Sequence, residues 1–301
     1  MAAKFWHTNL LTSTKINAKI FLHIVKYIKK TMYPVIRRMS MTWGTFTVQH
    51  ILSLAAIVAF AVSLHFILKR LSDKAKTRVL FAVSLIGVAA VLSDLVRWGQ
   101  PLLYLPLHLC SLNALIIPFA VLTKNKVAAH LTLVWSLGAM LVLIVNTGQA
   151  YYEMVSEAFW VFVLCHTVDV TVPALLFTTG LVEFNIKKAP AVIGTTMAAY
   201  TCVHFINIGI NKYLANQAAS LALYARSRAA IPQVNYMYSL GDEGNAAFAF
   251  FKKIIPYDYW HMYLIAPIIA AFLFAVHFGI KLRRKRKAKK ENITVKTEAL
   301  Q

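Results

Sequence analysis

Long, uninterrupted hydrophobic segments dominate the pattern of this chain. Their apolar residues run continuously and do not alternate with polar ones, which is typical of α-helices that cross a bilayer and not of barrel strands. Seven segments are long enough for this role: 49–69, 78–98, 104–123, 127–146, 157–182, 190–211 and 260–280. The pattern therefore predicts an all-α polytopic membrane protein, a bundle of seven transmembrane helices.

The hydrophobic segments divide the chain into three parts. Residues 1–48 form a basic N-terminal segment, residues 49–281 the transmembrane domain, and residues 282–301 a basic tail. The N-terminal segment either lies on the membrane surface or precedes a natural start at Met39 or Met41, which would remove all of its basic residues.

Composition narrows the class of protein further. Of the 301 residues, 59% are hydrophobic and 14% are charged, with 32 Lys and Arg against 11 Asp and Glu. So little polar surface excludes a conventional nucleic-acid-binding domain despite the formal charge of +21. The three cysteines all lie within hydrophobic segments, so they do not form a disulfide framework.

Basic residues orient the predicted bundle. Most of them lie in the connections after the first, third and fifth hydrophobic segments and in the tail, which are all on one side. Since cytoplasmic loops are enriched in Lys and Arg, we expect the tail in the cytoplasm and the long loop 212–259 on the outer side. On that outer side, Arg97 lies three residues from Asp94, and we expect an ion pair between them.

Polar residues within the spans gather in the outer half of the oriented bundle. Ionisable side chains inside a membrane are costly and usually face the bundle interior or a water-filled cavity, so we expect a cavity roofed by the loop 212–259. The alternative is that each histidine only hydrogen-bonds a neighbouring helix. The candidate binding residues of the cavity are His108, Asn113, Tyr200, His204, Asn207, Asn235, Tyr236, Tyr238, Trp260 and His261.

Cys110 is the candidate nucleophile for covalent chemistry. A thiol needs a nearby base, and on a regular helix His108 would point about 200° away from Cys110, so the base would be His166 or His204 from another span. Asp169, one turn from His166, is a candidate partner that orients the imidazole. A thiolate in a lipid-facing cavity suits acyl transfer through a thioester, whereas a thiol that serves only as a small hydrophobic side chain is the alternative.

Familiar catalytic motifs are absent from the sequence. It contains no P-loop, no glycine-rich dinucleotide-binding motif, no zinc-protease motif and no serine-hydrolase motif. With only 11 acidic residues, a carboxylate cage for a divalent metal is not expected, and the spacing of the histidines specifies no zinc site. We therefore expect neither a cofactor nor a metal.

Several strings resemble a known family. The string L-P-L-H-L-C-S-L at 105–112 is similar to the YwaF-like bacterial integral membrane proteins. The resemblance continues with C-H-T at 165–167, N-Y-M-Y at 235–238 and P-Y-D-Y-W at 256–260, and it covers about residues 49–280. It implies a seven-span bundle in the plasma membrane.

The resemblance also implies a chemistry. A eukaryotic relative of these proteins, transmembrane protein 164, is described as a cysteine-dependent acyltransferase that moves polyunsaturated chains between phospholipids and lyso-ether phospholipids. The matching positions here are Cys110 as nucleophile and His166 as base, and the partners would be membrane lipids, with a phospholipid or lysophospholipid as substrate. The longer stretch 212–232 and the intramembrane Asp169 depart from the expected pattern.

A second function stays open on the residues alone. A small-solute transporter or ligand-binding membrane protein would use the histidines and asparagines of the spans. Cys110 would then be dispensable, whereas His166 and His204 would be required.

Overall fold

Helices build nearly all of the described part of the chain, in which the only β pairing is an isolated bridge between Thr42 and Glu153. The computed structural model describes residues 42–97, 100–145, 151–220, 233–243 and 245–298. The expectations for the N-terminal segment concern residues 1–41, which lie outside these ranges. The helices are α3 (Val48–Lys69), α4 (Asp73–Arg97), η2 (Pro101–Leu103), α5 (Leu109–Thr123), α6 (Lys126–Val145), α7 (Glu157–Thr178), η3 (Ile186–Lys188), α8 (Ala189–Ser220), η4 (Tyr236–Tyr238), α10 (Ala246–Ile254), η5 (Trp260–Leu264) and α11 (Ile265–Glu298).

Six of these helices are long and apolar enough to cross a membrane, namely α3, α4, α6, α7, α8 and α11. The chain is therefore a multi-pass membrane protein with an all-helical bundle. The remaining predicted span, 104–123, is helical only in α5, which has 15 residues. At 1.5 Å per residue α5 rises about 22 Å, less than the roughly 30 Å of a hydrocarbon core.

The segment before α5 explains its late start. Within Leu105–His108 the chain makes a tight turn, in which the amide of Leu107 donates a hydrogen bond to the carbonyl of Leu105 at 2.7 Å. Pro106 lies inside this turn and disfavours a helical conformation at the residue before it. A regular helix through residues 104–110, on which the relative directions of His108 and Cys110 were predicted, is therefore wrong.

Charged contacts define the two ends of the bundle. At one end, the last residue of α4, Arg97, pairs with the first residue of α7, Glu157, at 2.8 Å. At the other end, Glu183 after α7 lies 4.0 Å from Lys126 at the start of α6 and 3.6 Å from Arg284 in α11. Since α5 connects these two ends, it runs the length of the bundle, and a membrane crossing by α5 as a seventh span stays a prediction.

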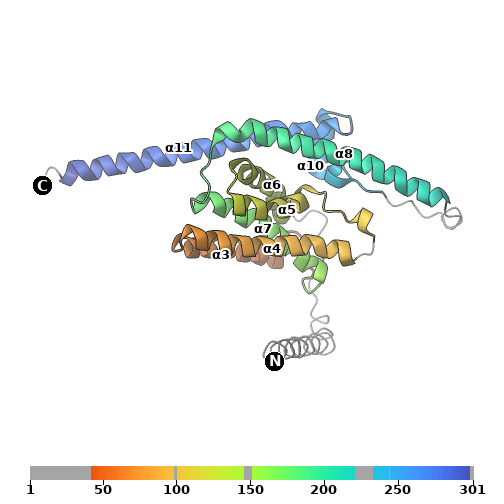
Figure 1. The fold of residues 1–301 in the computed structure, drawn as a ribbon, viewed down its shortest axis with the longest axis horizontal. Coiled ribbons are helices and arrows are strands. Elements are labelled where there is room, and N and C mark those ends of the chain that lie inside the picture. The colour runs from red at the N-terminus through yellow and green to blue at the C-terminus, as the bar shows by residue number, and fades with distance from the viewer. Residues whose placement is uncertain (1–41, 98–99, 146–150, 221–232, 244, 299–301) are drawn as a thin grey trace, which may run out of the picture.

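Helices α6 and α7 form the centre of the bundle. About half of the spanning residues of each are buried (56%), whereas only 11% are buried in α3 and in α11. Figure 1 shows α8 and α11 packed together along one flank of the group formed by α3 to α7. The apolar outer surfaces of α3 and α11 are therefore the surfaces that lipid would cover.

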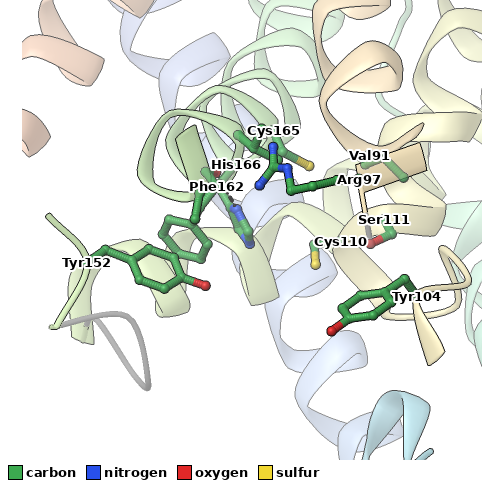
Figure 2. Close-up of a pocket in the computed structure, with 11 residues that line it drawn as sticks. Val91, Arg97, Tyr104, Cys110, Ser111, Tyr152, Phe162, Cys165 and His166 are labelled. Carbon is green, nitrogen blue, oxygen red and sulfur yellow. Dashed lines mark hydrogen bonds between the residues drawn. The ribbon is translucent and has the colours of Figure 1, made fainter. Parts of the chain in front are cut away.

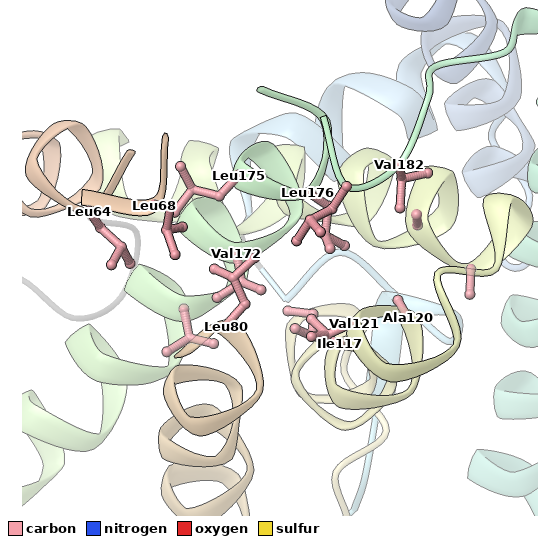
Figure 3. Close-up of a cluster of buried hydrophobic side chains, with 14 residues drawn as sticks. Leu64, Leu68, Leu80, Ile117, Ala120, Val121, Val172, Leu175, Leu176 and Val182 are labelled. Atoms are coloured by element: carbon pink, nitrogen blue, oxygen red, sulfur yellow. The ribbon is translucent and has the colours of Figure 1, made fainter. Parts of the chain in front are cut away.

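The largest buried cluster lies where α3, α4, α5 and α7 converge at one end (Figure 3). Helices α4 and α7 approach each other closely beside this cluster, at Gly87 and Val168. A Cβ atom added at Gly87 would lie 3.0 Å from Cγ1 of Val168, so the side chain of Val168 would have to shift by a few tenths of an ångström to accept it. The labelled members of the cluster are Leu64, Leu68, Leu80, Ile117, Ala120, Val121, Val172, Leu175, Leu176 and Val182.

Two helices are longer than the hydrophobic pattern predicts. Helix α8 continues to Ser220, beyond the predicted end at residue 211 and into the predicted loop. Helix α11 continues to Glu298 through most of the predicted tail, so these residues extend away from the bundle as one helix (Figure 1). Good helix formers such as Lys and Arg prolong both helices where no proline interrupts them.

Candidate functional site

A cavity of about 330 Å³ lies between α4, α5 and α7 at the end of the bundle that holds the Arg97–Glu157 pair. Its wall has a polar part that includes Arg97, Cys110 and His166 and an apolar part that includes Val91 and Val161. It is lined by Val91, Arg97, Tyr104, Cys110, Ser111, Tyr152, Ala158, Val161, Phe162, Cys165 and His166. Figure 2 shows the thiol of Cys110, the imidazole of His166 and the guanidinium of Arg97 directed toward a common space from three helices.

The unwound segment before α5 determines where Cys110 lies. Because α5 begins at Leu109, with His108 as its N-cap, Cys110 is the second residue of the helix. The first N–H groups of a helix have no partner within it and carry a partial positive charge. Cys110 therefore lies among backbone donors that can stabilise negative charge, next to the hydroxyl of Ser111 on the cavity wall.

A tyrosine from the distant loop holds this unwound segment in place. The hydroxyl of Tyr236 donates a hydrogen bond to the carbonyl of Leu102 at 2.8 Å and accepts one from the amide of Leu105 at 3.0 Å. The amide of Met237 donates to Nδ1 of His108 at 3.4 Å. Non-helical backbone at membrane depth is tolerated only where protein satisfies its polar groups. The hydroxyl of Tyr236 therefore provides the hydrogen-bond partner for the carbonyl of Leu102 and the amide of Leu105, which the interrupted helix leaves unpaired.

His166 presents an unprotonated nitrogen to the cavity. Its Nδ1 lies 2.7 Å from the carbonyl oxygen of Phe162, the dashed line in Figure 2. A carbonyl oxygen only accepts hydrogen bonds, so in the neutral imidazole Nδ1 carries the proton and the lone pair is on Nε2. The ring is buried, with 6% of its surface exposed, and packs on the ring of Phe162 with the centroids 4.2 Å apart.

Two other buried histidines differ from His166 in this respect. In His130, Nδ1 lies 2.5 Å from the carbonyl of Lys126, and Nε2 accepts from the amide of Asn185 at 2.9 Å. In His50, Nε2 lies 2.7 Å from the carbonyl of Leu143, and Nδ1 accepts from the amide of Phe46 at 2.9 Å. Both nitrogens of His50 and His130 are engaged in structure, whereas His166 keeps one nitrogen for the cavity.

Asp169 does not hydrogen-bond the imidazole of His166. It is fully buried one turn along α7, and its Oδ2 lies 4.0 Å from Sγ of Cys165. Its Oδ1 has no hydrogen-bond partner among the described residues. The role expected of Asp169, orienting the imidazole, is taken by the carbonyl of Phe162 because that oxygen lies one helical turn before the ring on the same helix.

Arg97, Tyr104 and Tyr152 line the cavity, although the sequence pattern did not single them out as binding residues. The guanidinium of Arg97 contacts Glu157, and the predicted partner Asp94 has a side chain outside the described part of the structure. Their common signal is position: Arg97 and Tyr104 lie at the ends of predicted spans and Tyr152 lies in the connection between two of them, where polar and aromatic side chains usually anchor a helix at the interface.

The predicted polar face of α8 binds the loop that follows it. Asn207 donates to the carbonyl of Tyr236 at 2.8 Å and to the hydroxyl of Ser239 at 2.9 Å, and its Oδ1 accepts from the amide of Tyr236 at 3.1 Å. Nδ1 of His204 lies 3.2 Å from the hydroxyl of Ser239, and the hydroxyl of Tyr200 donates to the carbonyl of Tyr259 at 3.1 Å.

The remaining predicted binding residues also lie away from the cavity. The side chain of Asn235 closes its own loop by hydrogen bonds to the carbonyl of Gly241 and the amide of Leu240. The ring of Tyr238 stacks on that of Phe248. His261 is buried, with its Nδ1 3.2 Å from the carbonyl of Tyr257, and Trp260 is exposed. Asn113 is fully buried, and neither atom of its amide has a hydrogen-bond partner among the described residues. The structure thus brings Cys110 and His166 together but assigns most of the others to anchoring the loop.

Electrostatic contacts in this loop favour a fixed conformation. The ammonium of Lys252 lies 2.8 Å from Asp258, whose hydrogen bond raises the pKa of Lys252. Burial raises the pKa of Tyr236 and of Tyr238, so both hydroxyls remain protonated and able to donate near neutral pH.

Among the described residues, no group of three or more His, Cys, Asp and Glu side chains is arranged to hold a metal ion.

Comparison with known protein families matches residues 45–278 to the TMEM164 family. This confirms the relationship to transmembrane protein 164, whereas the narrower YwaF-like grouping stays a prediction. No curated protein and no solved structure matches the chain. Because the match includes every described helix from α3 to η5 and the first part of α11, the chain belongs to the TMEM164 family.

Proposed function

We propose that this protein is a membrane-bound acyltransferase in which Cys110 carries the acyl group as a thioester and His166 transfers the protons. One observation carries the proposal: the thiol and an imidazole with its Nε2 lone pair available line the same cavity from two different helices. A thiol beside an oriented base is the usual arrangement of an activated cysteine nucleophile.

The proposed reaction has two balanced steps. Nε2 of His166 takes the proton of the Cys110 thiol as the sulfur attacks the ester carbonyl of a donor lipid. The C–S bond forms, the C–O ester bond breaks, and the lyso-lipid alkoxide leaves with the proton from His166. An acceptor hydroxyl then gives its proton to His166 and attacks the thioester. The new C–O bond forms, the C–S bond breaks, and the sulfur recovers the proton.

The first turn of α5 supports this chemistry. Each tetrahedral intermediate places negative charge on the former carbonyl oxygen, and preorganised N–H donors that stabilise such charge are a large source of catalysis. The N–H groups of the first turn of α5, where Cys110 lies, are suited to this role. The apolar wall at Val91, Val161 and Phe162 would accommodate acyl chains.

The proposed location follows from the same orientation. We place the C-terminus in the cytoplasm, because most basic residues of the connections and tail lie at the end of the bundle opposite the cavity. The plasma membrane is the location that the resemblance to the bacterial proteins implies. The cavity then lies at the level of the outer leaflet, and phospholipids and lysophospholipids there would be the substrates.

Solute transport has less support than acyl transfer. That alternative relied on His166 and on the histidine and asparagines of α8, of which His204, Asn207 and Asn211 all hydrogen-bond the loop 233–243. A side chain that anchors a loop is not available to a solute unless the loop leaves.

The test is trapping of the acyl group on the purified full-length protein. A phospholipid with a radiolabelled acyl chain is supplied, and label that hydroxylamine releases from the protein is measured together with the lysophospholipid formed. Cys110→Ala should remove the labelled thioester, and His166→Gln should slow its formation by about 100-fold or more, the usual contribution of a general base. Cys202→Ala is the matched control, because this cysteine is exposed on α8 away from the cavity, and it should keep full labelling.

Cys165 provides the sharpest contrary outcome. It lines the same cavity and lies one residue before His166. Label that persists in Cys110→Ala and disappears in Cys165→Ala would overturn the assignment of the nucleophile. Labelling of none of the proteins, with lipid profiles unchanged by Cys110→Ala in cells, would overturn acyl transfer itself.

A further inference from the structure

The Arg97–Glu157 pair at the cavity has no role in the acyl-transfer chemistry described above. Arg97 is the only Lys or Arg among the described residues that line the cavity. Its side chain is mostly buried, with 18% of its surface exposed, whereas that of Glu157 is 74% exposed. The pair therefore joins a guanidinium inside the cavity to a carboxylate that is largely in solvent.

This asymmetry makes Glu157 the partner that a ligand anion could replace. Because the carboxylate of Glu157 is largely in solvent, water can solvate it when it turns away from the cavity. The mostly buried guanidinium of Arg97 would remain in the cavity wall and would then need another anion as its partner. A guanidinium offers parallel N–H donors that match two oxygens of a phosphate, and Arg is a preferred residue for this recognition.

The position along the helices matches the geometry of a glycerophospholipid. Arg97 ends α4 and Glu157 begins α7, so the pair lies at the end of two spans, where lipid phosphates lie. Cys110, in the first turn of α5, lines the same cavity. In a phospholipid the ester carbonyls are only a few bonds from the phosphate, on the side of the acyl chains. One lipid molecule could therefore place its phosphate at Arg97 and an ester at Cys110.

We infer that Arg97 binds the phosphate of a phospholipid or lysophospholipid in place of Glu157 and that this contact makes the cavity select phosphate-bearing lipids over neutral glycerolipids. The hydroxyls of Tyr104 and Tyr152, which lie on opposite sides of the cavity in Figure 2, would be further donors for the phosphate or glycerol oxygens. This inference rests on the proposed function for its substrate, and it assigns a phosphate-binding residue to the same cavity.

Binding measured without turnover tests the inference. The full-length Cys110→Ala protein in detergent is titrated with 1-oleoyl lysophosphatidate and with 1-oleoylglycerol, which differ only in the phosphate. We expect the phosphate-bearing lipid to bind at least about tenfold more tightly, which corresponds to one good charge-assisted contact. Arg97→Gln should reduce this ratio to near one, and Arg97→Lys should keep part of it as a point charge.

Two further variants make the test specific. Glu157→Gln removes the competing carboxylate and should preserve or increase the preference for the phosphate. Arg284→Gln is the matched control, because Arg284 forms an Arg–Glu pair at the other end of the bundle, and it should leave the ratio unchanged. An unchanged binding ratio in Arg97→Gln would overturn the inference. It would also be overturned if Arg97→Gln weakened the binding of both lipids equally and Glu157→Gln lowered the preference for the phosphate.

Inorganic phosphate distinguishes a lipid site from a site for free phosphate. If millimolar inorganic phosphate displaces lysophosphatidate but not 1-oleoylglycerol, the cavity binds the free anion, and the assignment to lipids fails. All binding measurements use the Cys110→Ala protein, which cannot form the thioester. The binding ratio would therefore stand even if the acyl-transfer proposal failed. Conversely, active acyl transfer with no phosphate preference would overturn only the role of Arg97.

Discussion

The hydrogen bonds of each imidazole distinguish structural from reactive histidines in this bundle. Backbone groups use both nitrogens of His50 and of His130, so these rings connect helices and loops. Within the described part of the chain, the imidazole of His166 forms one hydrogen bond, to its own helix, which fixes the tautomer and leaves Nε2 unprotonated. Burial alone does not separate these cases, since all three rings are buried.

Substitution of His130 and of His166 should have opposite effects. His130→Ala leaves the amide of Asn185 and the carbonyl of Lys126 without their partner, so the free energy of unfolding should fall by about 1–3 kcal/mol for each group left buried and unpaired. His166→Ala breaks one bond and should lower stability less, while abolishing thioester formation. Thermal unfolding in detergent and acyl trapping measure the two effects. A stable, active His130→Ala protein would contradict this distinction.

The interrupted entry into α5 is the element that creates the cavity. A regular helix through residues 104–123 would place Cys110 within a closed backbone ladder, whereas the unwound start places it in an open first turn. The loop that contains η4 compensates for the interruption through Tyr236, and α8 holds that loop through Asn207. Cys110 is thus positioned by contacts from residues more than ninety positions away in sequence.

Removal of one hydroxyl should test this positioning. Tyr236→Phe loses the bonds to Leu102 and Leu105, so the free energy of unfolding should fall by about 1–3 kcal/mol. Acyl transfer should fall by roughly tenfold, because small displacements of a nucleophile are costly. Tyr213→Phe, at an exposed position on α8, is the control and should change neither quantity. Full activity in Tyr236→Phe would show that the loop does not position Cys110.

At the scale of the whole molecule, contacts between helix ends support seven crossings even though α5 is short. Arg97 and Glu157 meet at one end, and the ammonium of Lys76 at the start of α4 lies 3.4 Å from the carbonyl of Thr179 after α7 at the other. These pairs require α4 and α7 to run in opposite directions. Helix α6 is long enough to cross between the same ends, so this arrangement favours the predicted crossing by α5, which connects α4 to α6.

Cysteine labelling from the two sides of the membrane tests this topology. In a variant without the three native cysteines, Gln100→Cys should react with a membrane-impermeant maleimide on intact cells. Ser72→Cys and Asn125→Cys should react only after permeabilisation, because α4 and α5 each separate them from Gln100. Labelling of Gln100→Cys and Asn125→Cys from the same side would exclude a crossing by α5. Reversal of all three would place the tail outside.

Local pattern was sufficient for most of the helices. Continuous hydrophobicity predicted the six helices that are long enough to cross a membrane, because a helix in lipid satisfies its own backbone and needs only apolar side chains. The predicted span 104–123 is helical only from Leu109 onward. Cys110 and His166 were identified as candidates by residue type and depth. The end of α8 was predicted too early, because the hydrophobic pattern shows where a helix leaves lipid and not where it stops being helical.

By itself, the sequence determined that this chain is a helical membrane protein with a thiol and imidazoles among its spans. Only the tertiary structure decided which imidazole shares a cavity with the thiol, that Arg97 joins them, and that the asparagine face of α8 anchors a loop. The physical reason is that hydrophobicity is a property of each segment, whereas these assignments depend on hydrogen bonds between segments. Such bonds, like that of Tyr236 to the entry of α5, leave no periodic signal along the chain.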